Sequence, residues 1–161
     1  MHFATSGFIT NLDKTKVLMV FHKKLQTWVI PGGHLESNEY PADGACREIL
    51  EETGVQASII DSSVFKSVDT LKESAIATPY AMLAEMIPAK GDKESHIHMD
   101  FIFIGVANDK APLAKQEAEV ENVKWMTLDE VLKCQTFDTV KKIAQEILDE
   151  GGKEKCASLD L

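Results

Sequence analysis

The sequence predicts one α/β (α+β) domain in which a mixed β-sheet is sandwiched between helices. Strand-like and helical segments are mixed along the chain, but without the strict β-α-β alternation of a parallel sheet. The 161 residues are 44% hydrophobic and 27% charged, which is typical of a globular domain that buries its own core. We expect this single domain to span residues 1–150, and the Gly- and charge-rich residues 151–161 to form a flexible tail.

The first expected elements are strands. Residues 3–10 and 17–22 are rich in β-branched, aromatic and aliphatic side chains, and the turn sequence at 11–14 predicts that they form a hairpin. Residues 28–30 form a further short strand, which the Pro-Gly-Gly sequence at 31–33 ends.

Residues 41–53 are expected to form a helix. Pro41 suits the first helical position, Asp43 complements the positive end of the helix dipole, and Gly54 suits the C-terminal stop. Tyr40 is a poor N-cap, so the start of this helix is weakly signalled.

The second half of the chain predicts more strands and two helices. The expected strands are residues 55–60, 80–87, 96–106 and 123–126. Thr127 should cap a helix that runs to about residue 133, with Glu130 completing a capping box. Residues 138–149 have the apolar periodicity of an amphipathic helix.

Composition limits the partners. With 17 basic and 26 acidic residues the formal net charge is −9. This acidity argues against a basic surface that binds a large nucleic acid. It does not argue against a small phosphorylated substrate that a divalent cation bridges to the protein. No apolar run approaches the ~18 residues that span a membrane. Three widely spaced cysteines and the absence of a signal-peptide pattern favour a cytoplasmic location. The oligomeric state, a homodimer included, is left open.

The helix at 41–53 carries an acidic stripe. Glu48, Glu51 and Glu52 stand at i, i+3 and i+4, within an arc of roughly 100°. The opposite side, expected to be packed, consists of Ala45, Cys46, Ile49, Leu50 and Thr53. Neighbouring like charges destabilise a helix, and a cation that binds carboxylate oxygens, Mg²⁺ or Mn²⁺, would remove this cost. A solvated acidic face is the alternative.

The spacing around this helix is more specific than the glutamates alone. The sequence reads Gly33-x5-Glu39-x7-Arg47-Glu48-Ile49-Leu50-Glu51-Glu52-Thr53-Gly54-Val55. This segment resembles the signature motif of the Nudix hydrolase family (MutT-like pyrophosphohydrolases) in full. The resemblance implies an α-β-α sandwich with a loop-helix-loop catalytic motif. It also implies metal-dependent hydrolysis of a nucleoside diphosphate linked to another moiety.

The resemblance also suggests roles for individual residues. Glu51 and Glu52 are expected to be the main metal ligands, with help from the backbone carbonyl of Gly32. Glu48 is similar to the position that binds metal or acts as general base. Arg47, the only arginine, is expected to orient the glutamates, since it can bind a carboxylate such as Glu51 with two hydrogen bonds.

Residues outside and at the edge of the motif complete the expected site. Glu39 would support the loop, bind a further metal or contact substrate. Glu119 is our choice, among the acids before Trp125, for an additional metal ligand. Lys23 and Lys24 are candidate phosphate contacts, with exposed lysines at a strand end as the alternative.

Two further sets of residues allow two interpretations each. His96, His98 and Asp100 share one strand face and are either metal or substrate ligands or plain surface. The aromatic residues Phe101, Phe103 and Trp125 could stack on a base, but core packing is favoured, and Cys46 is expected to be core as well.

Two rival functions remain at this level. A Nudix-fold sensor would bind nucleotide without turnover, although such proteins usually lose motif glutamates that are all present here. A diphosphate isomerase on the same fold would require a His-rich metal site. The motif does not determine which diphosphate compound is the substrate.

Overall fold

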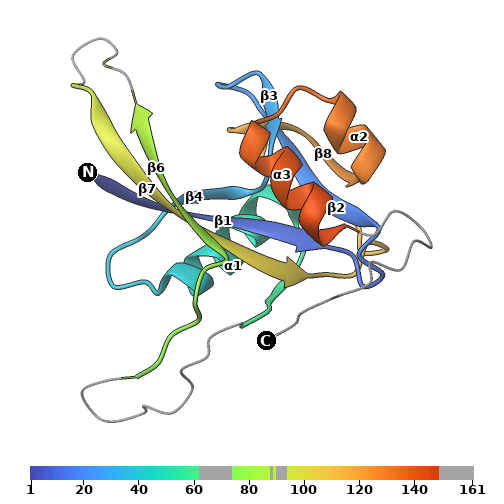
Figure 1. The fold of residues 1–161 in the computed structure, drawn as a ribbon, viewed down its shortest axis with the longest axis horizontal. Helices are drawn as coiled ribbons and strands as arrows, with labels where there is room; N and C mark the ends of the chain where they lie inside the picture. Colours follow the sequence, from blue (N-terminus) through green and yellow to red (C-terminus); the bar gives the residue numbers. More distant parts are fainter. Residues whose placement is uncertain (62–73, 88, 90–93, 149–161) are drawn as a thin grey trace, which may run out of the picture.

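The computed structural model describes residues 1–61, 74–87, 89 and 94–148 (Figure 1). Its helices are α1 (Pro41–Thr53), α2 (Leu128–Lys133) and α3 (Asp138–Ile147). Its strands are β1 (His2–Thr10), β2 (Lys16–His22), β3 (Thr27–Val29), β4 (Gly32–His34), β5 (Ser58–Ile59), β6 (Ala81–Ile87), β7 (His96–Val106) and β8 (Val120–Thr127). The tail expected at 151–161 lies outside the described residues.

The eight strands form one mixed sheet. Its central pair is β1 and β7, which run parallel with His2 opposite His98 and Thr10 opposite Val106. The other strand pairings in the described part are antiparallel, including the β1–β2 hairpin that the sequence predicts. The mixed sheet is therefore confirmed.

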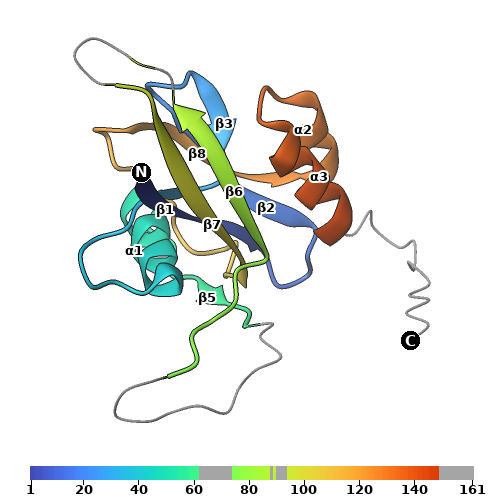
Figure 2. The same ribbon diagram turned by 60° about the vertical axis from the view of Figure 1, so that its left-hand side comes forward.

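Helices cover both faces of this sheet. Figures 1 and 2 show α1 on one face and the α2–α3 pair on the other. Each face has its own apolar cluster. On one face, Phe8 of β1 and Met19 of β2 pack in a cluster with Val140 and Ile143 of α3. On the other face, Ile9 of β1 packs in a cluster with Ile49 of α1. Neighbouring residues of one strand thus alternate between two cores, as a sheet buried on both faces requires.

Most expected elements are present, with differences at their ends. The strand expected at 55–60 is reduced to β5, the strand expected at 123–126 extends to all of β8, and α3 ends at Ile147. Strand β4 was not predicted, because glycines are poor strand formers. It pairs with β1, and a Cβ on Gly32 would lie 2.4 Å from the Thr5 carbonyl oxygen, so glycine is required there.

The helix ends follow the sequence signals closely. Tyr40 caps α1 without a side-chain hydrogen bond, and Gly54 ends it with a φ of 71°. Thr127 and Glu130 form the expected capping box of α2. Leu50 is a correction: it was expected on the packed face of α1 and is 50% exposed. No helix in the described part of the chain has the length and apolar character needed to cross a membrane.

The capping box provides a test of this fold. In Thr127→Ala the hydroxyl that accepts from the Glu130 backbone N–H is lost, so the free energy of unfolding should fall by about 1 kcal/mol in urea titrations. Thr127→Ser keeps the hydroxyl and should retain most of this stability. An equal loss in both variants would contradict the capping role.

Candidate active site

The packing of α1 against β1 fixes the position of the acidic residues. The Thr5 hydroxyl donates to the Pro41 carbonyl oxygen at 2.8 Å, at the start of the helix. Further along, Gly7 allows close approach, since a Cβ there would lie 2.5 Å from Cδ1 of Ile49. The last two turns of α1 are therefore held beside β4 and the loop that follows it.

Arg47 joins this loop to the helix. Its Nε and Nη2 atoms donate to the two carboxylate oxygens of Glu39 at 2.8 and 2.9 Å, and Nη1 donates to Glu48 at 2.8 Å. Nη2 also donates to the His34 carbonyl oxygen at 3.1 Å. The two-bond contact expected on Glu51 is thus made to Glu39 instead, and Glu51 lies at a longer 3.5 Å.

The Arg47 guanidinium lowers the pKa of Glu39, chiefly through these hydrogen bonds. Glu39 also accepts the Glu36 backbone N–H at 3.0 Å, so its oxygens are engaged within the loop. Among the roles considered for Glu39, support of the loop is the one that these contacts favour.

The three glutamates of α1 differ in exposure. The buried residues of the helix include Ala45, Ile49, Glu52 and Thr53, which are spaced i, i+4, i+7 and i+8. Glu52 therefore lies within the apolar stripe, and only 2% of it is exposed. Farther round the helix, 16% of the Glu48 side chain and 47% of the Glu51 side chain are exposed. The expectation that all three point away from the packed face is wrong for Glu52.

Glu52 is held against β4. One of its carboxylate oxygens accepts the Gly32 backbone N–H at 3.0 Å. Burial raises the pKa of Glu52 to about 7, and the negative charges of Glu48, Glu119 and Glu51 act in the same direction, while the Gly32 hydrogen bond opposes them. Glu52 is therefore a buried carboxyl group among other carboxylates.

Glu48 lies against Gly33, the next residue of β4. A Cβ on Gly33 would lie 2.5 Å from the carboxyl carbon of Glu48, so this glycine leaves room for the carboxylate. Together with Glu52 on Gly32, the contact places two carboxylates of α1 against consecutive glycines of β4. The double glycine of β4 thus serves close packing against α1.

Glu119 is brought near the motif by the segment before β8. Its side chain lies 3.7 Å from Nζ of Lys24, and its carbonyl oxygen accepts the Lys23 backbone N–H at 2.9 Å. The Lys23 ammonium group donates to the Glu117 carbonyl oxygen. Glu119, Lys23 and Lys24 therefore lie together, and the charge of Glu119 is close enough to act on Glu52, although Lys24 is largely exposed.

The donor set fits a hard divalent cation. Glu48, Glu51, Glu52 and Glu119 supply carboxylate oxygens, which are the ligands that Mg²⁺ and Mn²⁺ prefer. Burial is the main cause of the raised pKa of Glu52, and the repulsion from Glu48, Glu119 and Glu51 adds to it; such a cation would remove this repulsion. In this structure the carboxylates have different partners, since Glu48 contacts Arg47 and Glu52 accepts from Gly32.

Ser6 is a site residue that sequence reasoning missed. Its hydroxyl lies 3.0 and 2.9 Å from the two carboxylate oxygens of Asp100, and a Cβ on Gly32 would lie 2.6 Å from this hydroxyl oxygen. Burial raises the pKa of Asp100 to about 6. Because Ser6 meets Asp100 only through the pairing of β1 with β7, no local sequence signal could have shown it.

The remaining candidates are placed as follows. His98 lies beside His96 on the same face of β7, and burial together with neighbouring positive groups lowers the pKa of His98. Phe103 is buried under α1, and Phe101 and Trp125 pack against the same cluster, as the core interpretation expects. Cys46 is only half-buried.

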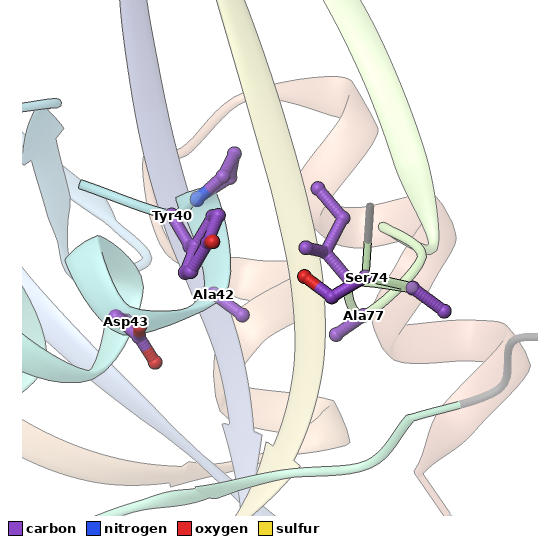
Figure 3. Close-up of a pocket in the computed structure, with 8 residues that line it drawn as sticks. Tyr40, Ala42, Asp43, Ser74 and Ala77 are labelled. Atoms are coloured by element: carbon purple, nitrogen blue, oxygen red, sulfur yellow. The ribbon is translucent and has the colours of Figure 1, made fainter. Parts of the chain in front are cut away.

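A shallow hollow lies at the other end of α1. Figure 3 shows Tyr40, Ala42 and Asp43 on one side of it, and Ser74 and Ala77 of the segment before β6 on the other. Tyr40 directly precedes α1, and Ala42 and Asp43 lie in its first turn, whereas the glutamates lie in its last two turns. The hollow is therefore separate from the carboxylate site.

The environment of Glu52 predicts a pH effect on stability in the absence of metal. Its pKa is 4.5 when unperturbed and about 7 in the fold, so the protonated group favours folding. This contribution is complete below pH 4.5 and is lost as the pH rises through 7. Between pH 5 and pH 8, wild type should therefore lose up to about 3 kcal/mol relative to Glu52→Gln.

Urea titrations of both proteins in EDTA measure this difference. Glu117→Gln, at an exposed carboxylate, is the control and should follow wild type. Added Mg²⁺ should restore stability to wild type at pH 8. The same pH dependence in wild type and Glu52→Gln would contradict the assignment.

Comparison with known proteins identifies relatives of this chain. The chain matches the family model described as NUDIX domain over residues 1–149. A putative 8-oxo-dGTP diphosphatase of Bacillus subtilis (strain 168) is 34% identical over 58 residues, which are 35% of this chain and 39% of that protein. A MutT-like protein of Streptomyces ambofaciens is 43% identical over 68 residues, which are 42% of this chain and 44% of that protein. The aligned segments thus span less than half of either relative.

Solved structures match over most of the chain. A NUDIX-family hydrolase from Clostridium perfringens superposes with a TM-score of 0.73 at 27% identity, covering 92% of this chain and 96% of that one. The E. coli dihydroneopterin triphosphate pyrophosphohydrolase shares the fold, with a TM-score of 0.65 at 15% identity, and the two coverages are 91% and 94%. The motif, the fold and the match over residues 1–149 together show that this chain belongs to the Nudix hydrolase family.

Proposed function

We propose that this hydrolase cleaves the diphosphate linkage of a nucleoside diphosphate joined to another moiety, with Mg²⁺ as its metal and Mn²⁺ as a substitute. The products are a nucleoside monophosphate, or its equivalent, and the phosphorylated second moiety. The observation that carries the proposal is the set of carboxylates around the buried Glu52, whose pKa is raised by burial and by the neighbouring negative charges.

The chain's own residues have distinct parts in this proposal. Glu51, Glu52, Glu48, Glu119 and the Gly32 carbonyl would hold the metal. When bound, the metal would neutralise the negative charge of the diphosphate and lower the pKa of bound water. Lys24 and Lys23 lie beside Glu119, where cationic groups can meet phosphate oxygens.

Glu48 is our candidate for the group that takes a proton from the attacking water. Only its Oε1 is engaged by Arg47, so its other oxygen remains able to accept. Arg47 itself is a positioning residue, because it contacts Glu39 and Glu48 and would act through them.

The substrate class is part of the proposal. Nucleoside triphosphates, oxidised and unmodified, are the first compounds to test, because one relative is named as a putative 8-oxo-dGTP diphosphatase.

We also propose a cytoplasmic location and one domain over residues 1–150. A sensor without turnover is disfavoured because every motif glutamate is present.

A panel assay tests the activity. With Mg²⁺ and nucleoside triphosphates, dinucleotides and nucleotide sugars, wild type should release a nucleoside monophosphate. Glu51→Gln and Glu52→Gln should each lower kcat by at least about 100-fold, since each removes a ligand charge. Mass spectrometry with separate determination of phosphate and pyrophosphate identifies the products.

Asp129→Asn is the matched control for these carboxylate-to-amide changes. Asp129 is exposed, pairs with Lys133 on α2 and should be replaceable without loss of activity. Nucleotide binding without any product would favour a sensor, and a product of unchanged mass would favour an isomerase. Either result contradicts hydrolysis.

Arg47→Lys tests the positioning role. Lysine keeps the positive charge but cannot span both oxygens of Glu39, so kcat/KM should fall by about 10- to 100-fold. Because the motif loop loses its anchor, the Mg²⁺ concentration for half-maximal rate should rise as well. Lys133→Arg exchanges the same residue types at an exposed ion pair and should change neither. Unaltered metal dependence in Arg47→Lys would refute the role.

A further inference from the structure

Four of the five histidines gather at one end of the sheet, and none of them is among the ligands of the carboxylate site. His2 begins β1, His34 ends β4, and His96 and His98 lie at the start of β7. The parallel pairing of β1 with β7 places His2 opposite His98. Figures 1 and 2 both show the N-terminal end of β1 away from α2 and α3, so these helices do not cover this part of the face.

Three of these side chains are close enough to share one ion. One ligand atom from each of His2, His96 and His98 lies within 4.8 Å of the others. The Nε2 atoms of His96 and His98 are 3.0 Å apart. Two nitrogens bound to tetrahedral Zn²⁺ at about 2.0–2.1 Å are roughly 3.4 Å apart. Small side-chain rotations would therefore bring the three nitrogens into a common coordination sphere.

A backbone contact orients one of the rings. Nδ1 of His96 lies 3.1 Å from the Glu94 carbonyl oxygen, which can only accept a hydrogen bond. Nδ1 therefore carries the proton, and in the neutral ring the lone pair lies on Nε2, the atom that faces His98. Histidines that bind metals are oriented in this way, with the second ring nitrogen donating to a carbonyl or carboxylate oxygen.

The alternative is a plain surface, since histidines two residues apart on a strand often have no ligand. Two observations argue against it. The third histidine comes from another strand and lies at the register partner of His98. Its ring is 4.7 Å from the His96 ring and 5.4 Å from the His98 ring, measured between centroids. The three rings therefore converge from two strands.

We propose that His2, His96 and His98 form a second metal site, specific for a borderline transition-metal ion, with Zn²⁺ the best match. Imidazole nitrogens suit Zn²⁺, whereas Mg²⁺ prefers the oxygen donors of the carboxylate site. Three protein ligands leave a fourth position for water. The site does not depend on the proposed hydrolysis, and His34 borders it at a centroid distance of 4.9 Å from His98.

Metal binding without substrate tests this site. Full-length protein made without a polyhistidine tag and freed of metal is titrated with Co²⁺, whose visible absorption reports four-coordinate nitrogen ligation, and with Zn²⁺ in competition. Wild type should bind one Co²⁺ with these bands, and millimolar Mg²⁺ should leave the bands in place. His98→Ala should weaken Co²⁺ binding by more than about 100-fold.

Two variants separate this site from the rest of the protein. His22→Ala removes the one histidine outside the cluster, and Glu51→Gln alters the carboxylate site, so both should keep the bands. His2→Gln, at an exposed position at the sheet end, should lose them even if His98→Ala does not fold. Equal binding by His2→Gln and His22→Ala, or loss of the bands in Glu51→Gln, would overturn the proposal.

Discussion

The hydrogen bonds of Arg47 are the interaction on which the rest of the candidate active site depends. One guanidinium group joins β4 through the His34 carbonyl, the following loop through Glu39, and α1 through Glu48. A planar group with five N–H donors can serve three segments at once, which a lysine ammonium cannot do with the same geometry. The carboxylates of this region would otherwise repel one another without a fixed arrangement.

The second constraint is the rotation of α1 about its own axis. Ala45 and Ile49 must face the sheet to bury their apolar surface, and helical periodicity then carries Glu52 into the same stripe. The helix therefore buries a carboxyl group that accepts the Gly32 backbone N–H. A buried acidic group with a raised pKa is common where a protein performs chemistry, and here it lies within the motif that defines the family.

The mixed sheet, the bounds of α1, the capping box of α2 and the family are all predictable from local features of the amino-acid sequence. These features depend on local signals: a proline and a glycine at helix ends, alternating apolar residues in strands, and a spaced motif. The errors arise where the local signal is weak or where the deciding contact is non-local. Strand β4 was missed because glycine has low strand propensity, and its pairing with β1 is a non-local contact.

By itself the sequence determined which residues of the motif carry charge and that they lie close together on one helix. Only the tertiary structure decided what each one contacts. Arg47 makes its two-bond contact with Glu39 rather than with Glu51 because the loop after β4 folds back over the helix. Glu52 is buried, and Ser6 meets Asp100, because strand pairing and helix packing join residues far apart in the chain. Spacing along one helix follows from backbone geometry, but contacts between elements follow from the packing of the whole core.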